Sequence, residues 1–257
     1  MGEALLHLHL QSQELARDER GYAVWRTITA SRAVPAVNTA IVICDVWDNH
    51  WSRSAAERTA ELASRVNAVI QAARERGARI IHAPSETMDF YADSPARRRM
   101  RELPAVDVPP PREQPEPPLP VDASDGGSET GEIETDTGWT RQHPDIAIDE
   151  ERDGISDDGA EIYRFIQHAA IQQVLIVGVH TNMCILHRSF AIEALVRRGI
   201  PVALVRDLTD ALYNPAKPPY VSHDEGTRLV VEYIEKFWCP TVQSGDLTRV
   251  SGQSREE

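Results

Sequence analysis

The sequence predicts an α/β fold, a three-layer sandwich with a mainly parallel β-sheet covered by helices on both faces. Two observations carry this prediction. From residue 39 onward, short apolar segments alternate with longer segments in which apolar residues recur every three or four positions. The short segments are apolar at nearly every position, as in strands that are buried on both faces of a parallel sheet. Such strands in alternation with amphipathic helices are typical of α/β proteins.

The first part of the pattern contains two strands and one helix. Residues 39–47, TAIVICDVW, are predicted to be a buried strand, and residues 78–86, ARIIHAPSE, the next one. Between them, residues 54–77 are expected to form an amphipathic helix. We expect Ser54 and Glu57 to form a capping box at its start, because this pair satisfies free N–H groups of the first turn.

The pattern resumes at residues 145–148 and continues to the last predicted strand. Further strands are expected at residues 174–179, 201–207 and 239–243. One helix is indicated by apolar residues on a single face, namely Ile162, Phe165, Ile166 and Ala169. Another is expected over residues 185–198. The last helix begins at Ser222, which forms a second expected capping box with Glu225.

Three segments lie outside the β-α core, which we place at residues 38–245. Residues 1–37 alternate apolar and polar positions in two stretches, so we expect an N-terminal β extension, as a hairpin or two edge strands. Residues 103–138 interrupt the core with many prolines and no apolar periodicity, so they form an inserted loop, not a domain. This insertion is either a solvated surface excursion or a lid or oligomer contact. Residues 246–257 are a C-terminal tail.

The charge balance argues against two classes of partner. The net charge is −13, and residues 102–136 supply −9 of it through ten Asp and Glu against one Arg. An acidic chain is a poor match for nucleic acid or an anionic membrane. No apolar run approaches the roughly 20 residues of a membrane span, and the N-terminus lacks a secretory signal pattern. We therefore expect a small-molecule substrate and a cytoplasmic protein. We also expect a homo-oligomer.

The three cysteines are Cys44, Cys184 and Cys239, which are far apart and odd in number. This spacing predicts neither a disulfide framework nor a cysteine metal site, in keeping with a reducing cytoplasm. Cys44 lies inside an apolar strand, and Cys239 starts the last strand, so both are expected to pack in the core. Cys184 follows a strand and precedes a helix, which leaves its thiol to be explained.

Polar residues follow the predicted strands at the edge where α/β sheets bind ligands. Asp45 follows the first strand, and Cys184 lies at the end of HTNMC, after the strand 174–179. A helix N-terminus favours thiolate and its N–H groups can bind an oxyanion, while Asp45 can take the thiol proton. This combination predicts a nucleophile with an acid/base partner. The alternative is an inert buried cysteine near an aspartate that only ends a strand.

Aromatic residues and histidines follow the same strands. Trp47 and His50 are expected to line the pocket, and so is His82 after the second strand. The alternative is a metal ion held by His50 and His82 with Asp48 or Glu86, but pocket-lining or hydrogen-bonded histidines are favoured. We therefore expect neither a metal nor another cofactor.

Two segments stand out, AIVICDVWDNHW at residues 40–51 and VLIVGVHTNMCIL at residues 174–186. They resemble the isochorismatase-like cysteine hydrolases, which include nicotinamidases and N-carbamoylsarcosine amidases. The resemblance implies a six-stranded sheet in the order 3-2-1-4-5-6, with Cys184 as nucleophile and Asp45 as acid/base. It also implies a cis peptide between Val179 and His180 that serves the oxyanion site. The implied reaction cleaves a C–N bond of a small amide-like substrate through a covalent intermediate.

One departure from this family concerns its catalytic lysine, which lies on the loop before the helix that leads to the cysteine strand. The chain has only two lysines, Lys217 and Lys236, and both follow Cys184. The alignment places Glu150 or Glu151 at the lysine position. Either another cation substitutes (Arg141, Arg152 or Lys217), or the chemistry has changed, or the protein is a non-catalytic member that binds a ligand or a partner.

Overall fold

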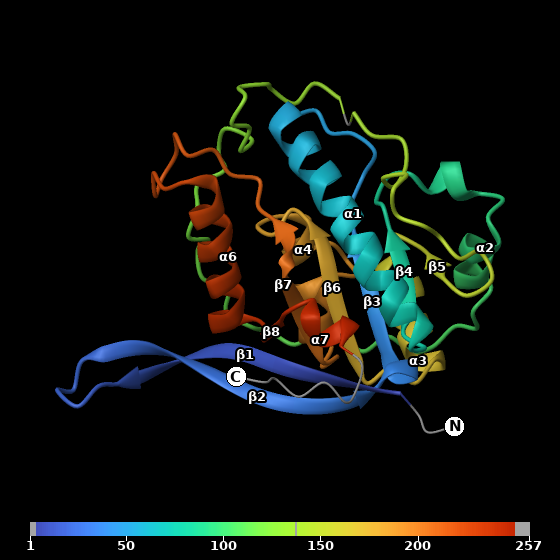
Figure 1. The fold of residues 1–257 in the computed structure, drawn as a ribbon, viewed down its shortest axis with the longest axis horizontal. Coiled ribbons are helices and arrows are strands. Elements are labelled where there is room, and N and C mark those ends of the chain that lie inside the picture. The colour runs from blue at the N-terminus through green and yellow to red at the C-terminus, as the bar shows by residue number, and fades with distance from the viewer. Residues whose placement is uncertain (1–3, 137, 250–257) are drawn as a thin grey trace.

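A single mixed β-sheet with helices on both faces forms the centre of the computed structural model, which describes residues 4–136 and 138–249 (Figure 1). Its strands are β1 (Leu5–Arg17), β2 (Ala23–Pro35), β3 (Thr39–Cys44), β4 (Arg79–Ala83), β5 (Gly154–Ile155), β6 (Gln173–Val179), β7 (Val202–Asp210) and β8 (Thr241–Val242). The helices are α1 (Arg53–Glu75), α2 (Pro95–Arg101), α3 (Gly159–His168), α4 (Cys184–His187), α5 (Ile192–Arg197), α6 (His223–Phe237) and α7 (Gly245–Thr248). Two short 3-10 helices complete the list, η1 (Ala36–Asn38) and η2 (Met88–Tyr91).

The sheet has eight strands in the order β2-β1-β8-β7-β6-β3-β4-β5 and is not wholly parallel. The strands from β8 to β5 pair in parallel, and with β3 counted as strand 1 this part reads 3-2-1-4-5-6. The expected six-stranded sheet is too small, because the N-terminal hairpin joins the same sheet. Strand β1 pairs antiparallel with β8 at Gln11 and Thr241 and with β2 along its whole length.

The two faces of the sheet have separate apolar cores. Helices α1 and α7 cover one face, where Leu62, Val66 and Leu247 pack on the odd-numbered side chains of β3 and β6. Helices α3, α4, α5 and α6 cover the other face. The wholly buried strands β3 and β6 therefore lie in the middle layer, as the continuous apolar runs predict. None of the described helices is both long enough and apolar enough to cross a membrane.

Three expected details of the helices are wrong or incomplete. The N-cap of α1 is Ser52, not Ser54, because Ser52 has the extended backbone of a cap and its Oγ accepts from the Ala55 N–H. Ser222 caps α6 as expected, but Glu225 pairs with Arg228. The expected helix over 185–198 is two short helices, α4 and α5, because the chain is extended at Arg188, with φ −59° and ψ 149°.

The insertion has no helix or strand within its described residues 103–136 and 138, yet it is not solvated along its whole length. Its proline-rich part runs beside α6 (Figure 1), where the Tyr233 hydroxyl donates to the Pro117 carbonyl. Val121 is buried in the core. Ser128 is buried beyond it, where the Ser52 hydroxyl donates to its Oγ at 2.9 Å. The insertion is therefore packed against the domain on both sides of Val121.

The two ends of the chain lie partly outside the described residues. The predicted N-terminal β extension contains β1 and β2, and its inner half buries Leu6 and Leu8. Its outer half projects beyond the domain (Figure 1). Of the predicted C-terminal tail, residues 246–248 belong to α7, and residues 250–257 lie outside the residues that the structure describes.

Candidate active site

The fold brings Asp45 and Cys184 together at the carboxyl edge of neighbouring strands. Strands β3 and β6 are parallel neighbours, and Cys44 at the end of β3 lies opposite Gly178. Asp45 follows β3, and the turn that follows β6 leads to Cys184, the first residue of α4. Both therefore lie at the edge where open α/β sheets bind ligands.

Gly178 makes this close approach possible. Its φ of +116° is rarely adopted by residues with a side chain. A Cβ atom at this position would also collide with the Cys44 carbonyl oxygen. The backbones that carry Asp45 and Cys184 can therefore lie this close only with glycine here.

Asp45 is fully buried and accepts two hydrogen bonds. The Ser85 N–H donates to Oδ1 at 2.8 Å, and Arg188 Nε donates to Oδ2 at 2.9 Å. The Cys184 thiol lies close enough to the carboxylate to affect its pKa. Burial raises the pKa of Asp45, although Arg188, the thiol and Ser85 each oppose this. A carboxylate that holds a proton more readily than usual is a better base toward the thiol.

Cys184 is partly buried beside Asp45. Burial raises the pKa of the thiol, and the Asp45 carboxylate raises it further. Arg188 and the His180 backbone lower it. The peptide bond between Val179 and His180 is cis. The thiol therefore stays protonated at rest, beside the acid that can accept its proton.

Arg188 is the cation of this site. Its Nε contacts Asp45, and both Nη atoms lie 3.3 Å from Glu86 Oε1 at the surface. The break between α4 and α5 at Arg188 places its side chain against Asp45, which in turn raises the pKa of the guanidinium. A positive charge therefore lies beside the Asp45–Cys184 pair.

The cations that the sequence suggested lie elsewhere. Arg141 is 3.9 Å from Asp48, and Arg152 is 2.6 Å from Asp149. The Lys217 backbone helps to shape the turn after Tyr213. Among the described contacts of Asp45 and Cys184 none of these three takes part, so the expected surrogates are wrong.

The lysine-equivalent position also lies away from the cysteine. Glu150 Oε2 accepts hydrogen bonds from Ser94 Oγ at 2.7 Å and from the Ala96 N–H at 3.0 Å, at the start of α2. The carbonyl oxygens of Glu150 and Glu151 accept from Arg99. The Glu150 side chain therefore anchors α2, and a lysine at this position would lose its two bonds, whereas the bonds from Arg99 use backbone carbonyls and do not depend on the side chain.

Aromatic side chains form a cluster that joins the segment after β3 to His180. Trp47 stacks on Trp139 with ring centroids 3.9 Å apart, and His50 lies between Trp139 and His180 at 5.5 and 5.0 Å. Burial lowers the pKa of His50 to about 4 and that of His180 to about 3, with His50 adding to the effect on His180. Both imidazoles are therefore neutral near pH 7.

Three buried polar atoms near this group have no hydrogen-bond partner among the described residues. They are Ser85 Oγ, Trp139 Nε1 and His180 Nε2. A buried polar group without a partner costs roughly 1–3 kcal/mol, so such groups are uncommon unless a ligand or water completes them. These atoms are therefore candidates for contacts with a polar substrate.

His82 belongs to a different, structural group. It is fully buried, with Nδ1 2.8 Å from Gln142 and Nε2 3.0 Å from Asp153, which also pairs with Arg74. The expectation that His82 lines the pocket is wrong, because this network holds it beside the Arg74 side chain of α1. His82 and His50 do not converge on a shared metal position among the described residues.

The other two cysteines lie in the apolar core that α3, α4, α5 and α6 cover. Cys44 is fully buried, and Cys239 is 7% exposed. Burial raises the pKa of both thiols, to about 12 for Cys239. Only Cys184 has both partial exposure and a carboxylate that accepts its proton.

Two residues of the site were not expected from the sequence, and one of them had a usable signal. For Arg188 that signal is its distance of four residues from Cys184, which places a cation close to the thiol in the chain, although the helix ends at His187 and the side chain does not lie on a helical face. Trp139 follows the insertion, and no local pattern connects it with Trp47, 92 positions earlier. Its place depends on how the insertion returns to the domain.

Comparison with known proteins identifies the family of the chain. A family model for the isochorismatase domain matches residues 39–217. No curated protein matches the chain. Among solved structures, a cysteine hydrolase from Pseudomonas syringae pv. phaseolicola superposes with a TM-score of 0.50 at 14% sequence identity, and the match covers 84% of this chain and 92% of that one.

Two further structures are similar to the chain at lower scores. An isochorismatase family protein from Burkholderia thailandensis has a TM-score of 0.47 at 15% identity, over 82% of this chain and 93% of that one. An N-carbamoylsarcosine amidase from Thermoplasma acidophilum has a TM-score of 0.41 at 12% identity, over 84% of this chain and 99% of that one. The family model covers well over half of the sequence, so the chain belongs to the isochorismatase family.

Proposed function

We propose that the protein is a cysteine hydrolase that cleaves a C–N bond of a small amide-like substrate through a covalent intermediate on Cys184. The observation that carries the proposal is the juxtaposition of the Cys184 thiol and the fully buried Asp45 carboxylate, which accepts a hydrogen bond from Arg188 Nε at 2.9 Å. A nucleophile beside a base, with a third group that orients the base, is the arrangement that activates side chains for covalent catalysis.

The reaction follows from these contacts in two halves. Cys184 Sγ attacks the carbonyl carbon as its proton moves to Asp45, and the C–N bond breaks as Asp45 returns that proton to the leaving nitrogen. Water then attacks the thioester and gives a proton to Asp45. The C–S bond breaks, and the thiolate takes the proton back. The sum is an amide and water converted to an acid and an amine.

Arg188 takes the place of the family's lysine in this proposal. It stabilises negative charge on whichever of the two acids is ionised, because it lowers the pKa of both Asp45 and Cys184. The backbone N–H groups of His180 and Cys184 are proposed to hold the oxyanion. Glu86 keeps the outer side of the guanidinium in place.

The substrate class is proposed from the surroundings of the thiol. The Trp47–Trp139 stack offers a flat apolar wall, and the neutral His50 and His180 rings favour an uncharged substrate. The unpartnered atoms of Ser85, Trp139 and His180 can bind amide or ureide groups. A small planar amide or ureide fits this combination.

The test is a substrate screen with small amides, ureides and nicotinamide on the parent chain and three cysteine variants. Cys184→Ala is expected to lose turnover by a factor on the order of 10⁶, as when a covalent nucleophile is removed. Cys44→Ala and Cys239→Ala are the matched controls and should retain turnover. Full activity in Cys184→Ala would refute the covalent mechanism. If Cys184 also resists alkylation near neutral pH, a non-catalytic member that binds a ligand or a partner becomes the better assignment.

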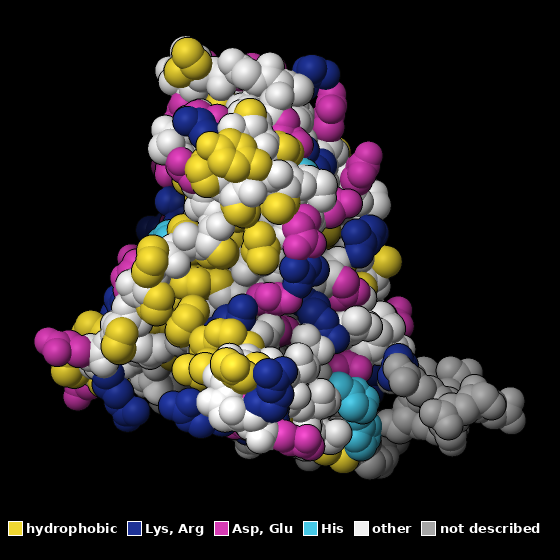
Figure 2. All heavy atoms as spheres, turned by 90° about the vertical axis from the view of Figure 1, so that its left-hand side faces the viewer, with side chains coloured by type: hydrophobic (Ala, Val, Ile, Leu, Met, Phe, Trp, Pro, Cys, Tyr) yellow, Lys and Arg dark blue, Asp and Glu magenta, His cyan; other side chains and the backbone are white. Residues whose placement is uncertain are grey.

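Assembly and compartment are part of the same proposal. The hairpin exposes Leu15, Tyr22, Trp25 and Ile28, and Figure 2 shows hydrophobic side chains gathered on the face that includes α6 and the proline-rich part of the insertion. Exposed apolar surface of this kind supports a homo-oligomer, which sedimentation velocity measures directly. Three unpaired cysteines support a reducing compartment such as the cytoplasm.

A further inference from the structure

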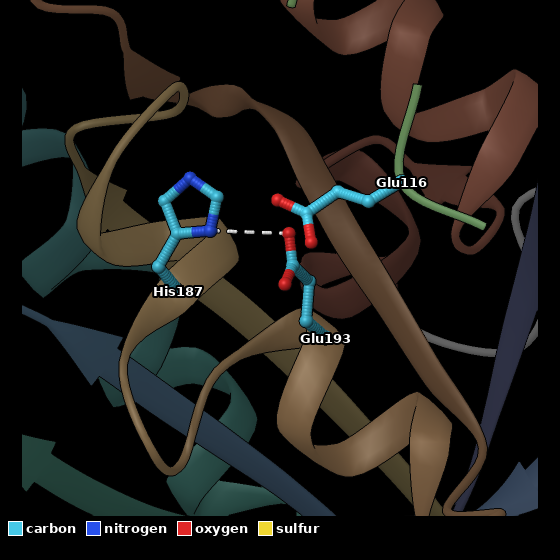
Figure 3. A group of neighbouring side chains, drawn as sticks. All are labelled: Glu116, His187 and Glu193. Carbon is cyan, nitrogen blue, oxygen red and sulfur yellow. Dashed lines mark ion pairs between the residues drawn. The ribbon is translucent and has the colours of Figure 1, made fainter. Parts of the chain in front are cut away.

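Beyond the thiol, a second cluster of polar side chains joins the insertion to the α4–α5 segment (Figure 3). Glu116 comes from the insertion, His187 ends α4, and Glu193 lies in the first turn of α5. One ligand atom from each lies within 4.8 Å of the other two. Among the described residues, this is the group of three metal-ligating side chains that lies close enough to share an ion.

Glu193 is the unusual member of this cluster. Its side chain is 9% exposed, and Oε1 has no hydrogen-bond partner although His187 Nδ1 lies 3.1 Å away. In Figure 3 the two carboxylates and the imidazole point toward one another. A buried carboxylate oxygen that lacks a donor is costly, and it indicates that a ligand completes its surroundings.

Arg197 compensates only part of the negative charge. Its Nη2 lies 3.2 Å from Glu116 Oε2 and 3.6 Å from Glu193 Oε2, while its guanidinium lies over the Trp238 ring. The contact with Arg197 therefore uses Oε2 of each carboxylate, and Glu193 Oε1 remains on the side of His187. Two carboxylates and one guanidinium leave one negative charge without a partner, and a divalent cation would exceed that charge by one.

We propose that Glu116, His187 and Glu193 bind a divalent transition-metal ion such as zinc. One imidazole nitrogen and two carboxylate oxygens suit zinc, with a fourth position left for water, whereas calcium and magnesium prefer oxygen ligands alone. Tetrahedral bonds of about 2.1 Å put ligand atoms roughly 3.4 Å apart, so ligand atoms that lie up to 4.8 Å apart must approach by up to about 1.4 Å. Glu116 and His187 are half-exposed and can make this movement.

The ion would connect the insertion to the segment that carries Cys184 and Arg188. His187 immediately precedes Arg188, and Glu116 lies in a part of the insertion that has no helix or strand. Arg197 would then orient the two carboxylates from outside the metal's ligand sphere, a role that typically changes metal affinity 10- to 100-fold. The site does not depend on the proposed hydrolase activity.

The test is a calorimetric titration of the metal-stripped full-length chain with zinc chloride. One equivalent is expected to bind, and His187→Ala, Glu193→Gln and Glu116→Gln should each weaken binding at least tenfold. The matched control is His7→Ala, which removes an exposed histidine of β1 far from the cluster in sequence. The Cys184→Ala chain should bind zinc as the parent does.

A thermal shift provides the second readout. Zinc should raise the Tm of the parent and of His7→Ala but not of Glu116→Gln, whose half-exposed side chain makes a folding defect improbable as an explanation. Absence of zinc binding to the parent would overturn the proposal, as would binding that survives all three ligand variants or is lost only with Cys184. Equal affinity for calcium would overturn the assignment to a transition metal.

Discussion

Two fully buried aspartates, Asp45 and Asp153, each pair with an arginine, but their surroundings differ. Asp153 receives two hydrogen bonds from Arg74 at 3.1 and 2.6 Å, one from the Asp149 N–H at 2.8 Å, and a contact with His82 at 3.0 Å. Asp45 receives one bond from Arg188 and one from the Ser85 N–H, and it lies beside the Cys184 thiol.

The consequence is an opposite change in pKa. Burial acts to raise the pKa of both carboxyls, but at Asp153 the bonds from His82 and Arg74 outweigh it and lower the pKa. At Asp45 burial prevails and the pKa is raised. Asp153 has more donors than Asp45, so it is held as an anion and stabilises the fold. Asp45 has one N–H donor on each oxygen, from Ser85 and Arg188, and is left able to exchange a proton.

The largest expected difference is in turnover. Asp45→Asn should lower the rate by a factor on the order of 10²–10⁴, because an amide cannot take the thiol proton. Asp153→Asn, in whatever fraction remains folded, should keep Cys184 reactive. Steady-state kinetics with the best substrate of the screen measure both. Comparable losses in the two variants, after correction for folded fraction, would remove the distinction between them.

Stability should change in the opposite order. Asp153→Asn breaks a buried pair and should cost about 3–5 kcal/mol of unfolding free energy at pH 7. Because the folded pKa of Asp153 is lowered, this contribution is present above the unfolded value of about 3.8 and is lost as the pH falls through the folded pKa.

The same unfolding experiment on Asp45→Asn should give the reverse sign. The folded pKa of Asp45 is raised, so its ionised form destabilises the fold above that pKa, and the penalty disappears below about pH 3.8. Asp45→Asn should therefore unfold in urea at or above the parent's midpoint at pH 7. A midpoint well below the parent's would mean that Asp45 is structural.

A smaller effect is expected from the arginine itself. Arg188→Gln removes the charge that favours ionisation of Asp45 and Cys184, so the apparent pKa of Cys184 alkylation should rise by about one unit. The alkylation rate near neutral pH should then fall about tenfold. Arg188→Lys should restore part of that rate. The control is Arg141→Gln, whose partner is Asp48, and an unchanged pH profile in Arg188→Gln would exclude Arg188 as the lysine's substitute.

The smallest effect on the site is expected at the lysine-equivalent position. Glu150→Lys should cost about 0.5–2 kcal/mol of stability, because Glu150 accepts from Ser94 and Ala96 at the start of α2. Alkylation of Cys184 should not change in this variant or in Glu151→Lys. A faster reaction in either one would show that this loop reaches the thiol.

Local patterns in the sequence were sufficient for the fold class and for the edge of the sheet at which the site lies. The apolar runs of β3 and β6 and the amphipathic pattern of α1 depend only on neighbouring residues. The spacing of apolar side chains shows whether a strand is buried on both faces and which face of a helix is buried. The placement of Asp45 and Cys184 after neighbouring strands follows from that pattern.

The tertiary structure decided which charged side chains meet. Arg188 contacts Asp45 only because the helix expected over 185–198 breaks at that residue, and His82 joins Asp153 and Gln142 instead of the pocket. The cluster of Glu116, His187 and Glu193 joins segments about 70 positions apart. Charged and polar contacts of this kind carry no periodic signal in the sequence, because they depend on distances that exist only after the strands and the insertion have packed.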